Sequence, residues 1–368
     1  MESERLYWLA WSQVSGVGAV TLQRLQKHFS SLKKAWEANQ QELQQVSGLG
    51  KKSIAQILEQ RSRLSPETIL TEHLKKNPQF WTPSDEEYPR LLLEIPSPPP
   101  TLYYRGKIDP QEMQGTRPLI SIVGTRSPSE YGKKWTQKLT FTLVKHGYTI
   151  VSGLAAGIDG IAHQSCLEAG GRTIAVLGTG LDITYPQENR NLYQKVEENG
   201  AILTEYAQGT QPDRGNFPAR NRIVAGLSRA VIVTEAPEKS GALITAKYAN
   251  EFGRDVYVLP GSLDNKNAIG CLGLLNRGAN VILSEGHLLE MLGTMPQLDL
   301  LPEKSAPEPE IAPELKEILS AIASEPTAFD LIVQNVPQTP NAIAAGLLQL
   351  ELLGLISQAP GMRYQRIN

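Results

Sequence analysis

The chain has 368 residues, of which 40% are hydrophobic and 20% charged, and its 36 Lys and Arg against 38 Asp and Glu give a net charge of −2. This is the composition of an ordinary globular protein of two or three domains, and it excludes a chain that coats nucleic acid by bulk charge. No run reaches the ~20 apolar residues of a membrane helix. The N-terminus does not resemble a signal peptide, and two cysteines and five histidines form no disulfide or zinc pattern. We therefore expect a cytoplasmic protein with no membrane partner.

Residues 1–78 carry Leu, Gln, Lys and Glu at helical spacing and predict a small helical domain. Within it, VSGVGAVTLQRL (14–25) and VSGLGKKSIAQIL (46–58) each place a small-residue turn before an amphipathic helix, which resembles the paired helix-hairpin-helix turns of sterile-alpha-motif-like domains. Such turns can hold DNA phosphates without reading bases. Lys51 and Lys52 make the second turn the better candidate for a secondary DNA contact, and the alternative is that both turns only close a helical bundle.

Residues 79–298 predict the core domain, in which a Pro-broken segment leads into short β-branched runs separated by helical stretches. This alternation predicts an α/β fold with a Rossmann-like, doubly wound parallel sheet. The expected strands are LISIV (119–123), YTIV (148–151), TIAVL (173–177), AILT (201–204), AVIVT (230–234), DVYVL (255–259) and NVIL (280–283).

Small-residue turns follow most of these runs, as in IVGTRSPSEYG and VSGLAAGIDG. Because the carboxyl ends of parallel strands share one edge of the sheet, we expect the turns to converge there and their N–H groups to face an anion. Arg126, in the first turn, should point into that crevice. Asp159 and His163 share one helix face, either as two metal ligands or, as we favour, as a hydrogen-bonding pair; without a third ligand no metal site is predicted.

The segment FPARNRIVAGLSR (217–229) is rich in arginine, and no acid occurs between Arg214 and Arg229. Guanidinium groups suit phosphate oxygens, and an aromatic ring such as that of Phe217 can stack on a base. This combination predicts single-stranded nucleic acid as the ligand, unless Phe217 is a plain core residue.

Residues 299–312 are Pro- and Glu-rich and predict a linker. Residues 313–368 predict a winged-helix domain, with helices near 314–322 and 339–353 and a two-stranded wing in GLISQAPGMRYQRI. Lys316 is the only basic residue from 312 to 362, so we expect this domain to contact protein rather than DNA.

Five strings occur in the order found in the DNA processing protein A family (DprA, also called Smf), and the chain resembles that family: VGTRSPSEYG (123–132), SGLAAGID (152–159), IAVLGTGLDITYPQEN (174–189), FPARNRIVAGLS (217–228) and EAPEKSGALITA (235–246). The resemblance implies a homodimer, without a cofactor, that binds single-stranded DNA in a cationic pocket. It also implies that the protein protects incoming strands in natural transformation and loads the RecA recombinase.

Carried over by position, the resemblance implies a DNA site made of Gly124, Arg126, Ser127, Ser152, Gly153, Gly157, Arg214, Phe217, Arg220, Asn221, Arg222, Ser240, Gly241 and Thr245. The chain departs from the family pattern at Gln187, where a basic residue is usual, and at Leu272, where Asn is usual.

A rival class is the Rossmann-like phosphoribohydrolases, whose PGGxGTxxE turn carries a catalytic Glu. Here SGALITAK places Lys247 at that position, and no acid lies between Glu238 and Glu251. Because the carboxylate is missing, and no P-loop or nucleophile motif is present, we expect no enzyme activity. A nucleotide-binding sensor stays open as the alternative, beside a phosphoribohydrolase-like enzyme.

Overall fold

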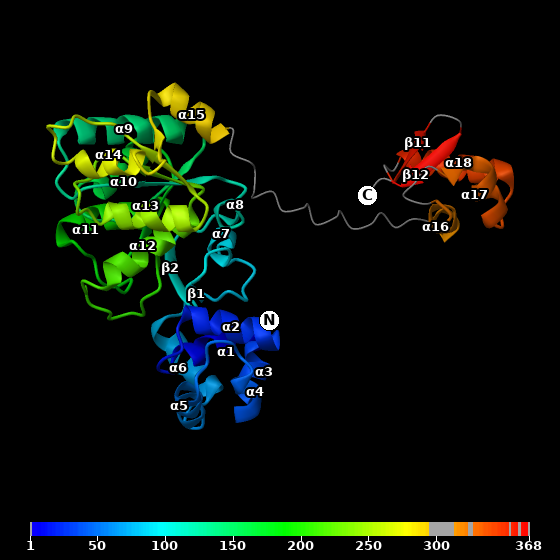
Figure 1. Ribbon diagram of the computed structural model, residues 1–368, viewed down its shortest axis with the longest axis horizontal. Coiled ribbons are helices and arrows are strands. Elements are labelled where there is room, and N and C mark those ends of the chain that lie inside the picture. Colours follow the sequence, from blue (N-terminus) through cyan, green and yellow to red (C-terminus); the bar gives the residue numbers. More distant parts are fainter. Residues whose placement is uncertain (1, 294–312, 323–326, 353–354, 360–361, 367–368) are drawn as a thin grey trace. The chain divides into compact units, whose positions relative to one another are not determined.

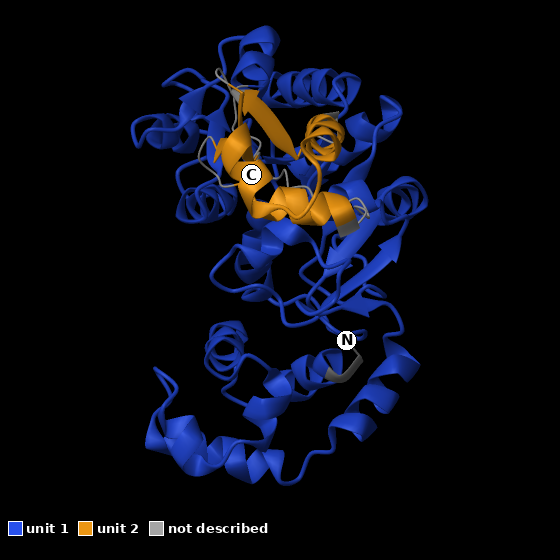
Figure 2. Ribbon diagram, turned by 90° about the vertical axis from the view of Figure 1, so that its right-hand side faces the viewer, with its two compact units in different colours: residues 1–299 blue, residues 300–368 orange. Residues whose placement is uncertain are grey.

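The computed structural model describes residues 2–293, 313–322, 327–352, 355–359 and 362–366. It contains two compact units, residues 1–299 and residues 300–368 (Figure 1; Figure 2). Within the described ranges, every helix is too short or too polar to span a bilayer.

The N-terminal part of the first unit is helical, as predicted. Its helices are α1 (Glu2–Ser12), α2 (Ala19–Phe29), α3 (Leu32–Glu37), α4 (Gln40–Gln44), α5 (Lys51–Arg61) and α6 (Pro66–Lys76). They close around buried Trp11, Leu22 and Leu43. In each predicted turn the first glycine has a positive φ, 84° at Gly16 and 85° at Gly48, which only glycine adopts without strain. The glycine two residues later is the N-cap of α2 or α5.

This helical part packs directly against the start of the core. The side chain of Leu9 lies with Phe80 and Tyr103 in one buried cluster. The Arg5 guanidinium lies 4.0 Å from the centre of the Phe80 ring and donates to the Phe80 carbonyl. The helices and the sheet therefore belong to one compact unit.

A nine-stranded sheet with the order β1-β2-β6-β5-β4-β3-β7-β8-β9 forms the core. From β3 the chain winds outward to β6, returns to the other side of β3 and winds outward again to β9. This is the predicted doubly wound arrangement, with its switch point between β3 and β7. The parallel strands are β3 (Leu119–Val123), β4 (Thr149–Ser152), β5 (Thr173–Val176), β6 (Ala201–Thr204), β7 (Ala230–Val233), β8 (Asp255–Val258) and β9 (Asn280–Val281).

Two strands were not predicted. β1 (Phe80–Trp81) pairs with β2 (Leu102–Gly106), and β2 adds to β6, both antiparallel. Pro100, the last proline of the 96–100 segment, is separated from β2 only by Thr101. These prolines hid the strand in the sequence, but they lie outside it and do not prevent it from forming at the sheet edge.

Helices cover both faces of the sheet (Figure 1). α9, α10, α11 and α15 bury their apolar sides against one face, and α12, α13 and α14 against the other. Their bounds are α9 (Glu130–Lys145), α10 (Ile158–Glu168), α11 (Arg190–Asn199), α12 (Asn216–Leu227), α13 (Ala242–Glu251), α14 (Ile269–Leu275) and α15 (Glu285–Gly293), with short α7 (Arg90–Leu93), α8 (Pro110–Met113) and η1 (Gln187–Asn189).

The second unit is the predicted winged helix. It consists of α16 (Pro313–Ser320), β10 (Thr327–Ala328), α17 (Phe329–Asn335), α18 (Pro340–Leu352), β11 (Ile356–Ala359) and β12 (Arg363–Arg366). The wing β11–β12 is antiparallel as predicted, and β10 adds a third strand. α17 and β10 were missed because both are short. The unit has its own core, which includes Ile318, Ile332 and Ile343.

Candidate functional site

The turns that follow the parallel strands do converge. They enclose a cavity of about 630 Å³ at the carboxyl edge of the sheet, beside the switch point between β3 and β7. We call it the rim cavity. Nine of the predicted residues line it, namely Gly124, Arg126, Arg214, Phe217, Arg220, Asn221, Ser240, Gly241 and Thr245.

Exposed basic side chains line the rim cavity. Arg126, Arg214 and Lys239 are exposed, and none of the three forms an ion pair with another residue in the described ranges. Asp159 is the acid in the lining, and it is only 7% exposed. Three free cationic groups around one opening can neutralise several phosphates at once.

Arg220, in contrast, is the buried arginine of the lining and is only 4% exposed. Its Nη1 donates to the carbonyl of Gly153 at 2.7 Å and to that of Val176, so the guanidinium joins the ends of β4 and β5 to α12. Burial lowers the pKa of Arg220 to about 10, although Asp159 opposes the shift. Its position fits a residue that supports the floor of the rim cavity.

Arg222 does not line the rim cavity. Its two terminal nitrogens donate to the two carboxylate oxygens of Glu205 at 2.8 and 2.7 Å, and both side chains are mostly buried. The sequence window without acids concealed this pair, because Glu205 lies nine residues before Arg214 in the chain.

Phe217 lines the rim cavity and is only half-buried. One edge of its ring packs on Gly178, where a Cβ would approach the ring to 2.8 Å. The ring centre lies 5.3 Å from that of Tyr185 and 5.8 Å from the Arg126 guanidinium. The same three side chains border a smaller hollow of about 50 Å³. An aromatic ring next to a free arginine is the arrangement that stacks on unpaired bases.

Several predicted glycine-turn groups are already used within the protein. The Ser152 hydroxyl is buried and donates to the Ile122 carbonyl at 2.6 Å, and the Gly153 N–H donates to Asp159 at 3.1 Å. These two residues therefore shape the turn rather than offer donors to a ligand. Gly157 has a φ of 78°, and a Cβ there would collide with the backbone of residues 125 and 126. Ser127 is exposed on that facing segment.

Asp159 and His163 do not pair with each other. Nδ1 of His163 lies 2.6 Å from the Thr173 hydroxyl, whereas the Asp159 carboxylate accepts a hydrogen bond from the Gly153 N–H. Burial raises the pKa of Asp159, and burial lowers the pKa of His163 to about 3 with Arg220 adding to the shift. Among the described residues, no group of three His, Cys, Asp or Glu is placed to hold a metal.

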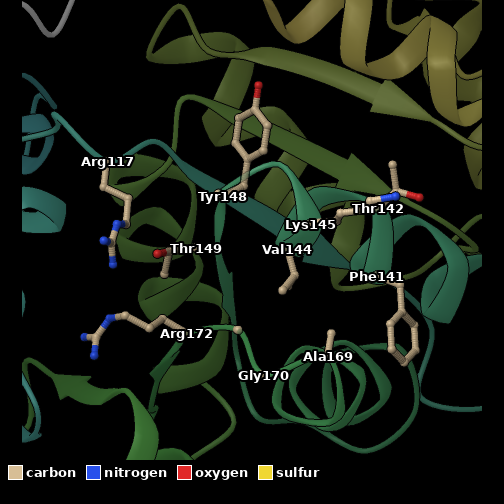
Figure 3. Close-up of a pocket in the computed structure, with 12 residues that line it drawn as sticks. Arg117, Phe141, Thr142, Val144, Lys145, Tyr148, Thr149, Ala169, Gly170 and Arg172 are labelled. Carbon is tan, nitrogen blue, oxygen red and sulfur yellow. The ribbon is translucent and has the colours of Figure 1, made fainter.

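A second hollow, of about 700 Å³, lies at the opposite edge of the sheet, where β4 and β5 begin (Figure 3). Its two arginines are neutralised: Arg172 donates to Glu112 at 2.7 and 2.9 Å, and Arg117 donates to Asp109 at 2.8 Å. The C-termini of α9 and α10 also end there and carry partial negative charge. We therefore assign no anion site to this edge.

The N-terminal candidates are placed differently. Lys51 and Lys52 are exposed in the first turn of α5, directly after the N-cap Gly50. They lie on the helical part of the first unit and do not line the rim cavity.

Among the lining residues that were not predicted, Lys239 and Tyr185 have side chains suited to binding a nucleic acid. Lys239 stands in the EAPEKSG string, directly before Ser240, so a search of that turn for cations would have found it. Tyr185 lies within the string IAVLGTGLDITYPQEN, to which no binding residue was assigned. Gln187 and Leu272 do not line the rim cavity.

Three family models match the chain. DNA recombination-mediator protein A covers residues 79–293, the DprA winged helix domain covers 302–362, and a SAM-like helix-hairpin-helix tandem covers 11–62. Among similar proteins, Protein Smf of Synechocystis sp. is 55% identical over 394 residues, which is 99% of each chain. DNA processing protein DprA of Streptococcus pneumoniae is 43% identical over 60% of this chain and 76% of its own.

Two solved structures are also similar. DNA processing protein A of Streptococcus pneumoniae matches with a TM-score of 0.66 at 35% identity, over 77% of this chain and 96% of its own. DNA processing protein A of Helicobacter pylori, described for its single-stranded DNA binding mode, matches with a TM-score of 0.52 at 35% identity, over 58% of this chain and 95% of its own. The ordered motifs, the doubly wound core, the flanking modules and a full-length relative agree, and the chain belongs to the DNA recombination-mediator protein A (DprA/Smf) family.

Proposed function

We propose that this protein binds single-stranded DNA in the rim cavity and does so without catalysis. The observation that carries the proposal is the grouping of three unpaired cations, Arg126, Arg214 and Lys239, with the accessible ring of Phe217. Cations hold the phosphates of any sequence, and a ring can stack on any base. The single-stranded DNA binding described for the Helicobacter pylori relative supports the same ligand.

Within this proposal the predicted residues have two roles. Arg126, Arg214 and Lys239 contact phosphates, Phe217 stacks on a base, and Asn221, Ser127, Ser240, Gly241 and Thr245 supply polar contacts around them. Arg220, together with Gly124, Ser152, Gly153 and Gly157, keeps the turns in place, and Arg222 stabilises the fold through its pair with Glu205. Lys51 and Lys52 form a secondary DNA contact on the helical part.

The proposal extends to the pathway that the family name suggests. We propose that the protein, as a cytoplasmic homodimer, protects incoming strands during transformation and transfers them to RecA recombinase. Membership in a recombination-mediator family supports this step. The direct test is whether the protein speeds RecA filament formation on single strands already covered by a single-strand-binding protein; no acceleration would remove RecA loading from the proposal.

Fluorescence anisotropy with labelled 30-mers tests the ligand class. We expect the single strand to bind at least about tenfold more tightly than the duplex, because stacking requires an unpaired base. AMP as competitor addresses the nucleotide-sensor alternative: displacement of the 30-mer by micromolar AMP would favour the sensor, and equal binding of duplex and single strand would contradict the proposed site.

A further inference from the structure

Glu235 follows β7 at the switch point and is only 2% exposed. Its carboxylate accepts from the Ser129 N–H and hydroxyl, both at 2.7 Å, and from the side-chain amide of Asn265 at 3.0 Å. Its backbone carbonyl accepts from the Thr125 N–H at 2.7 Å. One residue outside the rim cavity therefore bonds to both ends of the segment 125–129, which carries Arg126.

Further contacts fix the same segment from other sides. The Ile158 N–H donates to the Thr125 carbonyl at 3.1 Å, and the side-chain amide of Asn267 donates to the Ser127 carbonyl at 3.0 Å. There is also no spare room around the carboxylate, because a Cβ on Gly132 would collide with it. The Arg126 side chain is thus exposed on a segment that is held by four backbone hydrogen bonds and by a fifth through the Ser129 hydroxyl.

Electrostatics alone argues against an acid at this place. A buried carboxylate costs free energy unless donors satisfy it, and a negative charge near a phosphate site repels the ligand. Here three donors satisfy the carboxylate, and Ser129 is also the N-cap of α9, whose positive helix end favours an acid. The hydrogen bonds therefore give a reason for a buried acid at this position, whereas its charge does not.

We propose that Glu235 is a positioning residue for the DNA site: it fixes the segment 125–129 so that the Arg126 guanidinium meets a phosphate without a cost in loop ordering. This inference rests on the proposed function. It assigns to Glu235 no contact with DNA.

The substitution Glu235→Gln separates the positioning role from a charge effect, because the two predict opposite changes in DNA affinity. It removes one negative charge, so charge alone predicts tighter binding of a dT 30-mer. The single oxygen of Gln, however, can face either the Ser129 N–H or the Ser129 hydroxyl and the Asn265 amide, but not both sides, so at least one hydrogen bond to the segment or to Asn265 is lost. Positioning therefore predicts binding about tenfold weaker. The control is Glu238→Gln, an exposed acid beside Lys239 with the same change in charge, which should bind as tightly as wild type or more tightly.

A double-mutant cycle with Arg126→Ala identifies the residue through which Glu235 acts. In the Arg126→Ala background, Glu235→Gln should change the affinity less than twofold. Asn267→Ala, which removes only the bond to the Ser127 carbonyl, provides a milder variant should Glu235→Gln fold poorly, and it should weaken binding severalfold with the same dependence on Arg126.

Three outcomes are decisive. Unchanged or tighter DNA binding by a folded Glu235→Gln protein would overturn the positioning role. The same holds if the affinity losses of Glu235→Gln and Arg126→Ala simply multiply in the double mutant. Either result would leave the proposed DNA site intact. For a Glu235→Gln protein that does not fold, unchanged binding by Asn267→Ala would likewise overturn the positioning role. A wild-type protein that fails to bind the 30-mer would instead reject the proposed function itself.

Discussion

Arg126 and Arg222 carry the same charged group in opposite settings. Arg126 is exposed next to Phe217, whereas Arg222 is held by both oxygens of Glu205. A paired, largely buried guanidinium contributes to stability, because its removal leaves a carboxylate without its partner. A free one contributes to stability only weakly and is available to a ligand.

The two arginines should therefore separate stability from binding. We expect Arg126→Ala to weaken binding about tenfold for all oligonucleotide sequences alike, with no change in melting temperature. Arg222→Ala should lower the free energy of unfolding by about 2 kcal/mol and leave the affinity of the folded protein within about twofold. Thermal melts and anisotropy titrations on both variants measure these effects. A loss of stability in Arg126→Ala together with a loss of affinity in Arg222→Ala would contradict the roles assigned to the two arginines.

His163 gives a second prediction at this scale, through pH. Burial lowers its pKa to about 3, so between pH 6.5 and 3 the unfolded chain binds a proton that the folded protein excludes. The free energy of unfolding should therefore fall as the pH drops below 6.5, by about 2 kcal/mol at pH 5 from this group. Asp159, whose pKa is raised by burial, acts in the opposite direction.

Denaturant titrations of wild type and His163→Gln isolate that contribution, because Asp159 is present in both. The variant should lose about 2 kcal/mol less than wild type between pH 7 and pH 5. Exposed His28→Gln controls for the loss of a histidine as such. Equal losses in wild type and His163→Gln would mean that the buried imidazole is not neutral in the folded state.

At the scale of elements, the strand ends and their turns position the aromatic ring. Gly178 follows β5 and lies against Phe217, so Gly178→Ala should push the ring away from its place. We expect an affinity loss close to that of Phe217→Ala, about 1–3 kcal/mol of stacking. In the Phe217→Ala background, Gly178→Ala should have little further effect.

Gly286→Ala is the matched control for this prediction. Gly286 is exposed in α15 and has open space where a Cβ would lie. This change should stabilise the helix by about 0.5–1 kcal/mol and leave binding unaltered. Should Gly178→Ala bind like wild type in anisotropy, the ring would not be a stacking surface.

The elements also show what the sequence could predict. The parallel strands β3 to β8 were predictable because their residues, apart from the exposed Asp255, are buried and mostly apolar. The edge strand β9 is only half-buried. β1 and β2 were not predictable, since they pair antiparallel at the edge and follow proline. The burial of Arg220 in the lining of the rim cavity and the pairing of Arg222 with Glu205 were hidden for another reason: a sequence does not show which groups a guanidinium faces after folding.

At the scale of the whole molecule, the two units differ in their surfaces. In the first, three exposed basic side chains, Arg126, Arg214 and Lys239, line the rim cavity. In the second, α18 carries no Lys or Arg, and its exposed side includes Leu348. Because phosphate neutralisation supplies most non-specific affinity for DNA, this helix is a poor DNA reader.

We therefore expect residues 300–368, produced as a fragment, to show no binding to single- or double-stranded oligonucleotides at physiological salt. The remaining residues 1–299 should keep the affinity of the full chain within about threefold. Anisotropy on both fragments checks this. Tight binding of oligonucleotides by the C-terminal fragment would contradict this expectation and would mean that the winged helix binds DNA.

The salt dependence of binding tests the central claim most directly. For a dT 30-mer, the three phosphate contacts proposed for the rim cavity, at about 0.7 each, should contribute about −2 to the slope of log K against log salt. Arg126→Ala, Arg214→Ala or Lys239→Ala should each make the slope shallower by about 0.7. Lys247→Ala, an exposed cation on α13 paired with Glu251, should leave it unchanged. A slope near zero, or one that the three rim-cavity variants leave as steep as in wild type, would contradict the assignment of the rim cavity as the strand-binding site.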